Sequence, residues 1–240
     1  GHGRDKPDGL TERCHCYEFA SRGALGAFLR AHLAEFASPR GPGAVCLVYG
    51  ACLSRGLAAA AGDMDGGPLG EPPLLMSRHG YASQEMVNLL LIGNAYSNVF
   101  DGEQTMEGEG SDVIRLRGNP GKSEIGFLTL FEAYDYVLVG QNYKTPEHPI
   151  WVICSESHYS TIFSTDPDFF SKESSQESFD LHYFDGLANQ DEVIRLTVNM
   201  GNPYTGDDRD DKDLTPPIDK VIRTRWKKAT IDWNGAEPIL

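Results

Sequence analysis

Four strand-length segments in the second half of the chain constrain its fold more than any other feature. They cover residues 150–154, 158–163, 179–184 and 193–199, and polar loops separate them. Short apolar runs of this kind, bounded by turn-forming residues, are typical of β-strands. Because consecutive strands with short connections usually pair with one another, we expect an antiparallel meander.

Helical patterns precede these strands. Residues 21–36 and 44–62 repeat apolar side chains at helical spacing, and the second segment is apolar enough to predict a buried helix. Residues 81–102 contain a third helix, for which Ser83 is the expected N-cap and Gly93 the expected end. Helices followed by strands predict an α+β fold, with helices packed on an antiparallel sheet.

Three further segments are less regular. Residues 125–134 fit either a helix or a strand, and residues 136–140 are typical of a strand. Residues 102–111 are acidic and rich in glycine, which indicates a loop. We expect residues 1–16 to form a flexible N-terminal segment because they are polar and carry no periodic pattern.

Length and charge exclude some classes of function. The chain has 240 residues, which suits one large domain or two small ones. Its formal net charge is −14, so we expect no nucleic-acid partner, and an acidic surface instead suits a basic protein partner. No stretch approaches ~20 uninterrupted apolar residues, so we expect no transmembrane helix and no membrane partner.

The cysteines and the first residue bear on the origin of the chain. Five cysteines without regular spacing indicate reduced thiols and, with no signal-peptide pattern, predict an intracellular protein of the cytoplasm or nucleus. The chain begins with Gly1 rather than Met, and we expect a fragment of a longer protein. Cys14 and Cys16 flank a histidine, but zinc sites need a second ligand pair, so we expect no metal or other cofactor.

A polar cluster, Ser155-Glu156-Ser157-His158, interrupts two of the strand segments. If the next strand runs back with Asp180 opposite Phe163, then Asp185 lies opposite His158. Side chains directly opposite in an antiparallel pair lie ~4.5–5.5 Å apart at Cβ, so the carboxylate could orient the imidazole and stabilise its protonated form. This pattern makes the pair a candidate catalytic histidine with its orienting acid.

Other readings of the same residues stay open. A histidine at a strand end is usually a hairpin residue, and Asp185 with the glycine after it is a good turn dipeptide. A register slip of one residue would turn Asp185 to the other face of the sheet, in which case Asn189 on the following loop is the second choice as orienter.

Several blocks of the sequence resemble one family in the order in which they occur. They are HGYASQEMVNLLLIGNAYSNVFDG (79–102), IWVICSESHYSTIF (150–163), FDLHYFDGLANQ (179–190) and IRTRWKKATIDWNGAEPIL (222–240). These blocks resemble the C-terminal part of the catalytic domain of the MINDY deubiquitinases, most closely the MINDY-four subgroup. The resemblance assigns residues 17–240 to that portion of the domain.

The resemblance implies a papain-like cysteine peptidase variant that cuts polyubiquitin, with a preference for chains linked through lysine forty-eight of ubiquitin. It implies that His158 is the catalytic acid and base in a Ser-Glu-Ser-His motif, and that Asp185 falls where the family carries an acidic residue. Ubiquitin and polyubiquitin chains are then the partners, no cofactor is needed, and the reaction passes through a thioester.

The sequence departs from the family pattern in one respect. The family's nucleophile follows a segment like Gln-Gly-Gly-Pro-Cys, and neither this motif nor its glutamine occurs here. Cys46 follows a Gly-Pro turn, but its apolar surroundings favour an inert core thiol, and Cys154 lies in a strand segment too close to His158. The expected nucleophile therefore lies before Gly1, and the fragment itself can be inactive. The competing hypothesis is a ubiquitin-binding module or pseudoenzyme without a nucleophile.

Overall fold

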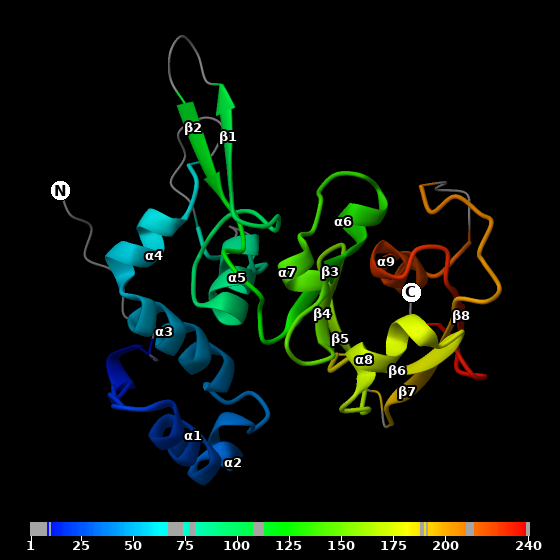
Figure 1. Ribbon diagram of the computed structural model, residues 1–240. Coiled ribbons are helices and arrows are strands. Elements are labelled where there is room, and N and C mark those ends of the chain that lie inside the picture. Colours follow the sequence, from blue (N-terminus) through cyan, green and yellow to red (C-terminus); the bar gives the residue numbers. More distant parts are fainter. Residues whose placement is uncertain are drawn as a thin grey trace. The chain divides into compact units, whose positions relative to one another are not determined.

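The computed structural model describes residues 9, 11–66, 74–76, 80–107, 113–187, 190, 192–209 and 214–238 (Figure 1). The chain forms two compact units, residues 1–59 and residues 60–240. The expected N-terminal segment, 1–16, includes the 3-10 turn η1 (Thr11–Arg13), while residues 1–8 and 10 lie outside the described residues.

The first unit is helical. The predicted helix over 21–36 is divided into α1 (Arg22–Ala31) and α2 (Leu33–Phe36), because His32 between them leaves helical geometry at φ −109° and ψ 13°. The Ser21 hydroxyl accepts a hydrogen bond from the Ala24 amide at 3.2 Å, as an N-cap does.

The predicted helix over 44–62 is also divided, into α3 (Gly43–Arg55) and α4 (Leu57–Asp63), because Gly56 adopts φ +85°. The prediction that this segment is buried is wrong: Leu47 and Leu53 are 61% and 56% exposed. Apolar residues lie on most sides of α3, so several of them remain exposed to solvent. No single helix within the described ranges is long and apolar enough to span a bilayer, although α3 and α4, bent by 89°, pass that test together.

The second unit begins with a capped helix and a β-hairpin. The predicted caps of α5 (Gln84–Ile92) are confirmed, since the Ser83 hydroxyl accepts from the Met86 amide and Gly93 is left-handed at φ +74°. The predicted loop over 102–111 is wrong in part. It contains β1 (Glu103–Glu107), which pairs with β2 (Val113–Arg117), while residues 108–112 lie outside the described residues.

A six-stranded sheet dominates this unit, in the order β3-β4-β5-β6-β7-β8. The predicted antiparallel meander is confirmed within one residue at each strand end. Its strands are β4 (Ile150–Ser155), β5 (His158–Phe163), β6 (Ser178–Phe184) and β7 (Ile194–Asn199). The sheet also contains β3 (Gly126–Thr129), parallel to β4, and β8 (Thr230–Asp232), antiparallel to β7. The expected α+β class is correct.

The segments that connect the hairpin to the meander mix both structures. Residues 125–134 hold a strand and a helix, because β3 continues directly into α6 (Leu130–Ala133), whose N-cap is Thr129. The predicted strand over 136–140 is wrong. Its Val139 is buried against other apolar side chains, and the Gly140 amide donates to the Val99 carbonyl ahead of α7 (Gln141–Lys144), so the segment joins no sheet.

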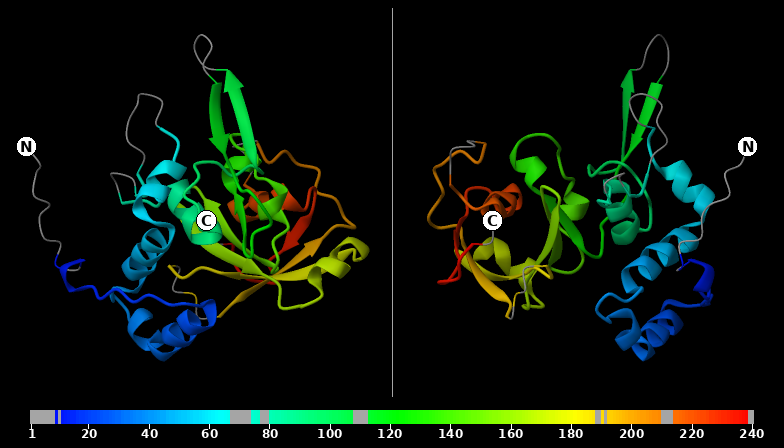
Figure 2. Two further views of the ribbon diagram at one scale, coloured as in Figure 1. Left: turned by 60° about the vertical axis from the view of Figure 1, so that its left-hand side comes forward. Right: turned by 180° about the vertical axis from the view of Figure 1, so that it is seen from behind.

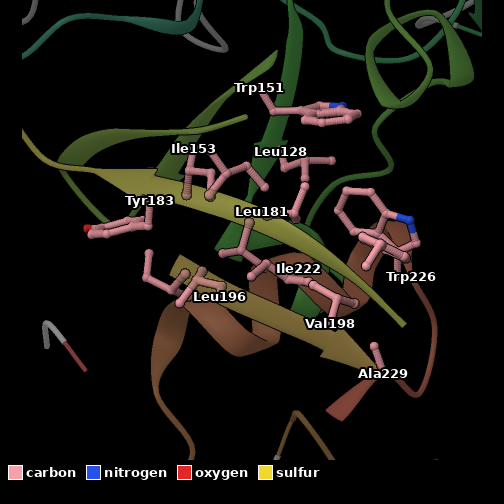
Figure 3. Packing of buried hydrophobic residues seen from close by; sticks show 14 of the residues in the cluster. Leu128, Trp151, Ile153, Leu181, Tyr183, Leu196, Val198, Ile222, Trp226 and Ala229 are labelled. Carbon is pink, nitrogen blue, oxygen red and sulfur yellow. The ribbon is translucent and has the colours of Figure 1, made fainter. Parts of the chain in front are cut away.

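The main core lies between the six-stranded sheet and α9 (Pro217–Arg225). Figure 3 shows Leu181 and Val198 of the sheet lying next to Ile222 of the helix. Trp151 is fully buried and packs edge-on against Trp226 at 5.3 Å between ring centroids. The short α8 (Phe169–Lys172), which the turn η2 (Glu173–Ser175) follows, adds two further phenylalanines to this aromatic cluster. The resulting rigid sheet fixes the ends of β5 and β6.

Asp219 makes the stability of this core depend on pH. It lies in α9 with 7% exposure and accepts a hydrogen bond from Trp233 Nε1 at 2.9 Å. Burial raises the pKa of its carboxyl from 3.8 to about 6. The folded state therefore favours the neutral carboxyl, and the resulting contribution to stability is complete below the pKa of the unfolded state. This contribution is lost as the pH rises through about 6.

We expect Asp219→Asn to stabilise the protein above pH 6 and to change little near pH 4, because the neutral amide keeps an acceptor for Trp233 Nε1. The gain at pH 8 should be on the order of 2–3 kcal/mol in the free energy of unfolding. Urea unfolding at both pH values measures it. A variant that is less stable than the wild type at pH 8 contradicts this account.

Candidate active site

His158 is held at the start of β5 by a tight turn. It pairs with Ser155 at the end of β4, and Glu156 and Ser157 form the turn between them. Glu156 adopts φ +56°, a left-handed conformation that residues with a side chain rarely adopt. The pairing of β4 with β5 and this turn together fix the backbone position of His158.

Asp185 directly follows β6, whose side chains alternate between the two faces of the sheet. Phe179, Leu181 and Tyr183 point into the main core, and Asp185 continues this inward series with 2% exposure. Ser160 and Ile162 are likewise the buried positions of β5, so His158 lies on the same face as Asp185. The alternation of both strands therefore directs the imidazole and the carboxylate to one side of the sheet.

The assumed register of β5 and β6 is wrong by two residues. The structure pairs Phe163 with His182 and Thr161 with Phe184, rather than Phe163 with Asp180. Asp185 is consequently a diagonal neighbour of His158 and not its direct partner. A shift of two residues keeps every side chain on its own face, and diagonal positions remain within reach of long side chains.

The imidazole and the carboxylate are in direct contact. His158 Nε2 lies 2.5 Å from Asp185 Oδ2. An ionised carboxylate only accepts hydrogen bonds, so Nε2–H donates and Nδ1 is the nitrogen without a proton in the neutral ring. Among the described residues no hydrogen bond involves Nδ1. Because the His158 side chain is 40% exposed, Nδ1 is available to a reacting group.

The carboxylate is itself held in place. Asp185 Oδ1 accepts from the Leu187 amide at 2.9 Å, and the Asp185 amide donates to Gln190 Oε1 at 2.8 Å. The Tyr183 hydroxyl lies 3.5 Å from Asp185 Oδ2. Sequence reasoning missed Gln190, whose position carries no signal, and Tyr183, which the inward series of β6 would have indicated. Asn189, the second choice as orienter, lies outside the described residues.

A groove of about 640 Å³ lies beside the turn that precedes His158. The turn contributes Glu156 and Ser157, and exposed apolar side chains also line the groove, among them Tyr136 and Leu138. Tyr159 also lines it, and alternation places Tyr159 on the other face of β5 from His158. The groove therefore lies on the other face of β5 from the imidazole and reaches the turn residues that precede His158 in the chain.

The thiol in the same unit as His158 does not complete this site. Cys154 is 5% exposed, burial raises the pKa of its thiol, and Sγ–H donates to the Glu156 carbonyl at 3.3 Å. It pairs with Tyr159 and so faces away from the imidazole. Burial also raises the pKa of the Cys52 thiol, and Cys46 is partly buried in α3. Within the described ranges, no three His, Cys, Asp or Glu residues form a metal-binding group.

Comparison with known proteins places the chain in a family. Residues 1–235 match the family model described as "Deubiquitinating enzyme MINDY-3/4, conserved domain". The chain is 43% identical to the mouse protein named "Probable ubiquitin carboxyl-terminal hydrolase MINDY-4", over 99% of the chain and 31% of that protein. It is 42% identical to the human protein of the same name, over 99% and 30% of the two lengths.

A more distant relative has a related name. The Drosophila melanogaster protein named "Ubiquitin carboxyl-terminal hydrolase MINDY-3 homolog" is 32% identical over 74% of this chain and 30% of its own length. No solved structure matches. The chain thus spans about a third of the length of these relatives, and nearly all of it matches the MINDY-4 proteins. The chain belongs to the MINDY-3/4 family of deubiquitinating enzymes.

Proposed function

We propose that residues 17–240 form the histidine-bearing, C-terminal portion of a papain-like catalytic domain that hydrolyses isopeptide bonds in polyubiquitin. The observation that carries the proposal is the 2.5 Å contact between His158 Nε2 and the buried Asp185 carboxylate, with Nδ1 left available. Family membership supports the substrate class, because the relatives are named ubiquitin carboxyl-terminal hydrolases.

The chemistry follows from the tautomer. Nδ1 takes the proton of a cysteine thiol, and the thiolate attacks the isopeptide carbonyl. The imidazolium, stabilised by Asp185, then returns the proton to the leaving lysine amine, and the ubiquitin remains as a thioester. Water, deprotonated by Nδ1, attacks the thioester carbonyl and releases the ubiquitin carboxylate and the thiol. Asp185 stays ionised throughout and holds the ring.

The groove beside the turn offers an approach for the substrate. Its apolar wall around Tyr136 and Leu138 suits an extended segment that carries the isopeptide bond. Such a segment would reach Glu156 and Ser157, the residues that immediately precede the histidine. The resemblance to MINDY enzymes adds chains linked through lysine forty-eight as the preferred substrate, which a panel of di-ubiquitins of defined linkage measures.

The nucleophile is proposed to lie outside residues 1–240, because the family's Gln-Gly-Gly-Pro-Cys segment does not occur in them and Cys154, the thiol in the same unit as His158, is buried and faces away from the imidazole. A ubiquitin probe with a cysteine-reactive group at its C-terminus tests this in the longer protein that contains the chain. We expect labelling to persist unchanged in a Cys46→Ala, Cys154→Ala double variant. Mass spectrometry of the adduct should find the probe on a cysteine beyond these residues.

Two other results would redirect the proposal. Labelling that disappears in the double variant would place the nucleophile on Cys46 or Cys154, and the single variants would then identify it. Binding of ubiquitin with no labelling in any variant would favour the alternative, a ubiquitin-binding module without a nucleophile.

A further inference from the structure

The hairpin of β1 and β2 forms a two-stranded sheet of its own. In Figures 1 and 2 it projects away from the six-stranded sheet of the same unit. Glu103 pairs with Arg117 at the base and Glu107 with Val113 near the tip. Isolated two-stranded hairpins are at best marginally stable in water, and their outer edges leave backbone groups unpaired. A hairpin of this kind is stabilised when one of its faces is covered.

The two faces of the hairpin differ in chemistry. Alternation and the register place Gln104, Met106, Ile114 and Leu116 on one face. Met106 and Ile114 are directly paired and are 56% and 50% exposed. The other face carries the charged residues and Val113, which is 65% exposed. The uncharged face therefore presents a small aliphatic patch to solvent, which we call the Met106–Ile114 face.

The side-chain contacts that hold the base come from Arg117, on the charged face. The Arg117 guanidinium donates to the Gly62 carbonyl and lies over the Tyr96 ring at 5.1 Å from its centroid. Below it, Asn98 Nδ2 donates to the Arg117 carbonyl at 3.0 Å. Arg117 alternates with Ile114, so these contacts hold the hairpin without covering the Met106–Ile114 face.

The same base forms part of the groove. Asn98 and Phe100 line the groove, and the Asn119 amide donates to the Phe100 carbonyl at 2.8 Å immediately after β2. Glu103 and Glu107 lie with Arg115 and Arg117 on the other face of the hairpin, so the Met106–Ile114 face carries no charge of its own. A partner that fits this face has an aliphatic surface, and it lies next to the groove when the groove is occupied.

We propose that the Met106–Ile114 face docks the folded body of a ubiquitin unit whose C-terminal segment occupies the groove. The inference rests on the proposed function, which supplies ubiquitin as the molecule in the groove. It adds a second contact, away from the reacting atoms, that contributes to the affinity for ubiquitin and not to the rate of the chemical step. Substitutions on this face should therefore weaken binding and raise KM while leaving kcat unchanged.

The test compares threonine substitutions on the two faces in the longer protein that contains the chain. Threonine is β-branched, so it preserves strand propensity while it removes aliphatic surface. We expect the Met106→Thr, Ile114→Thr variant to bind fluorescent mono-ubiquitin with a Kd raised about tenfold or more. The matched control Val113→Thr, on the other face, should stay within about twofold. Equal unfolding midpoints by circular dichroism show that both variants fold.

Each remaining outcome decides against the inference. Equal affinities of the two variants and the wild type overturn it, and the proposed function stands if the ubiquitin probe still labels the protein. A change in oligomeric state by sedimentation, with ubiquitin affinity unchanged, assigns the face to a second copy of the chain. A wild type that neither binds ubiquitin nor is labelled by the probe removes the proposed function and the inference together.

Discussion

Replacing His158 by alanine in the longer protein that contains the chain is expected to lower kcat for ubiquitin-chain hydrolysis by about 10²–10⁴-fold, the range that a positioned acid and base supplies. The loss follows because Nδ1 is the group proposed to take the thiol proton and return it to the leaving amine. Without the ring, the nucleophile stays protonated and the amine leaves unprotonated. Labelling by the ubiquitin probe should fall with kcat, whereas the Kd for mono-ubiquitin should change little, since binding uses other surfaces.

A second histidine provides the matched control. His182 lies on the neighbouring strand β6, pairs with Phe163 and stacks on its ring at 5.4 Å between centroids. His182→Ala removes the same side chain from the same sheet without touching Asp185, so we expect kcat within about twofold of the wild type. Steady-state kinetics on purified di-ubiquitin compare the two. Full activity in His158→Ala, or equal losses in both variants, would rule out the proposed role.

The strands could be predicted from the sequence because their apolar runs are short and bounded by polar loops. The register could not, because apolar residues two apart pair equally well on either side, and the structure shifts β6 by two residues from the assumed pairing. His158 and Asp185 are in contact despite this error, because a shift of two residues leaves both side chains on the same face of the sheet. Period-two alternation gives the face reliably and the register poorly.

Features that depend on tertiary contacts were harder to predict. Glycine and charge in residues 102–111 indicate a loop, yet Glu103–Glu107 form a strand because β2 supplies a partner. Residues 136–140 have strand composition, but their Val139 is buried in a cluster beside α7, and they pair with nothing in the sheet. The support of Asp185 by Gln190 depends on a loop whose path no local pattern encodes.

Asp185 gives the second large effect, because its two oxygens serve different donors. Oδ2 accepts from His158 Nε2 and Oδ1 accepts from the Leu187 amide. Asp185→Ala removes both acceptors, so the ring loses its fixed tautomer and the imidazolium its counter-charge. We expect kcat to fall about 10²–10³-fold, within the range of an orienting group, with KM nearly unchanged.

Asp185→Asn separates orientation from charge. Asparagine has one acceptor oxygen, and its amide nitrogen only donates. If the oxygen faces His158, the tautomer is kept and the Leu187 amide loses its acceptor; if it faces Leu187, the amide forces the proton onto Nδ1, which can no longer act as a base. We therefore expect kcat between those of the wild type and Asp185→Ala.

Measuring kcat, KM and the urea midpoint of both variants distinguishes this role from a structural one. Loss of kcat with unfolding unchanged supports orientation, whereas parallel losses of kcat and stability would make Asp185 a turn residue only.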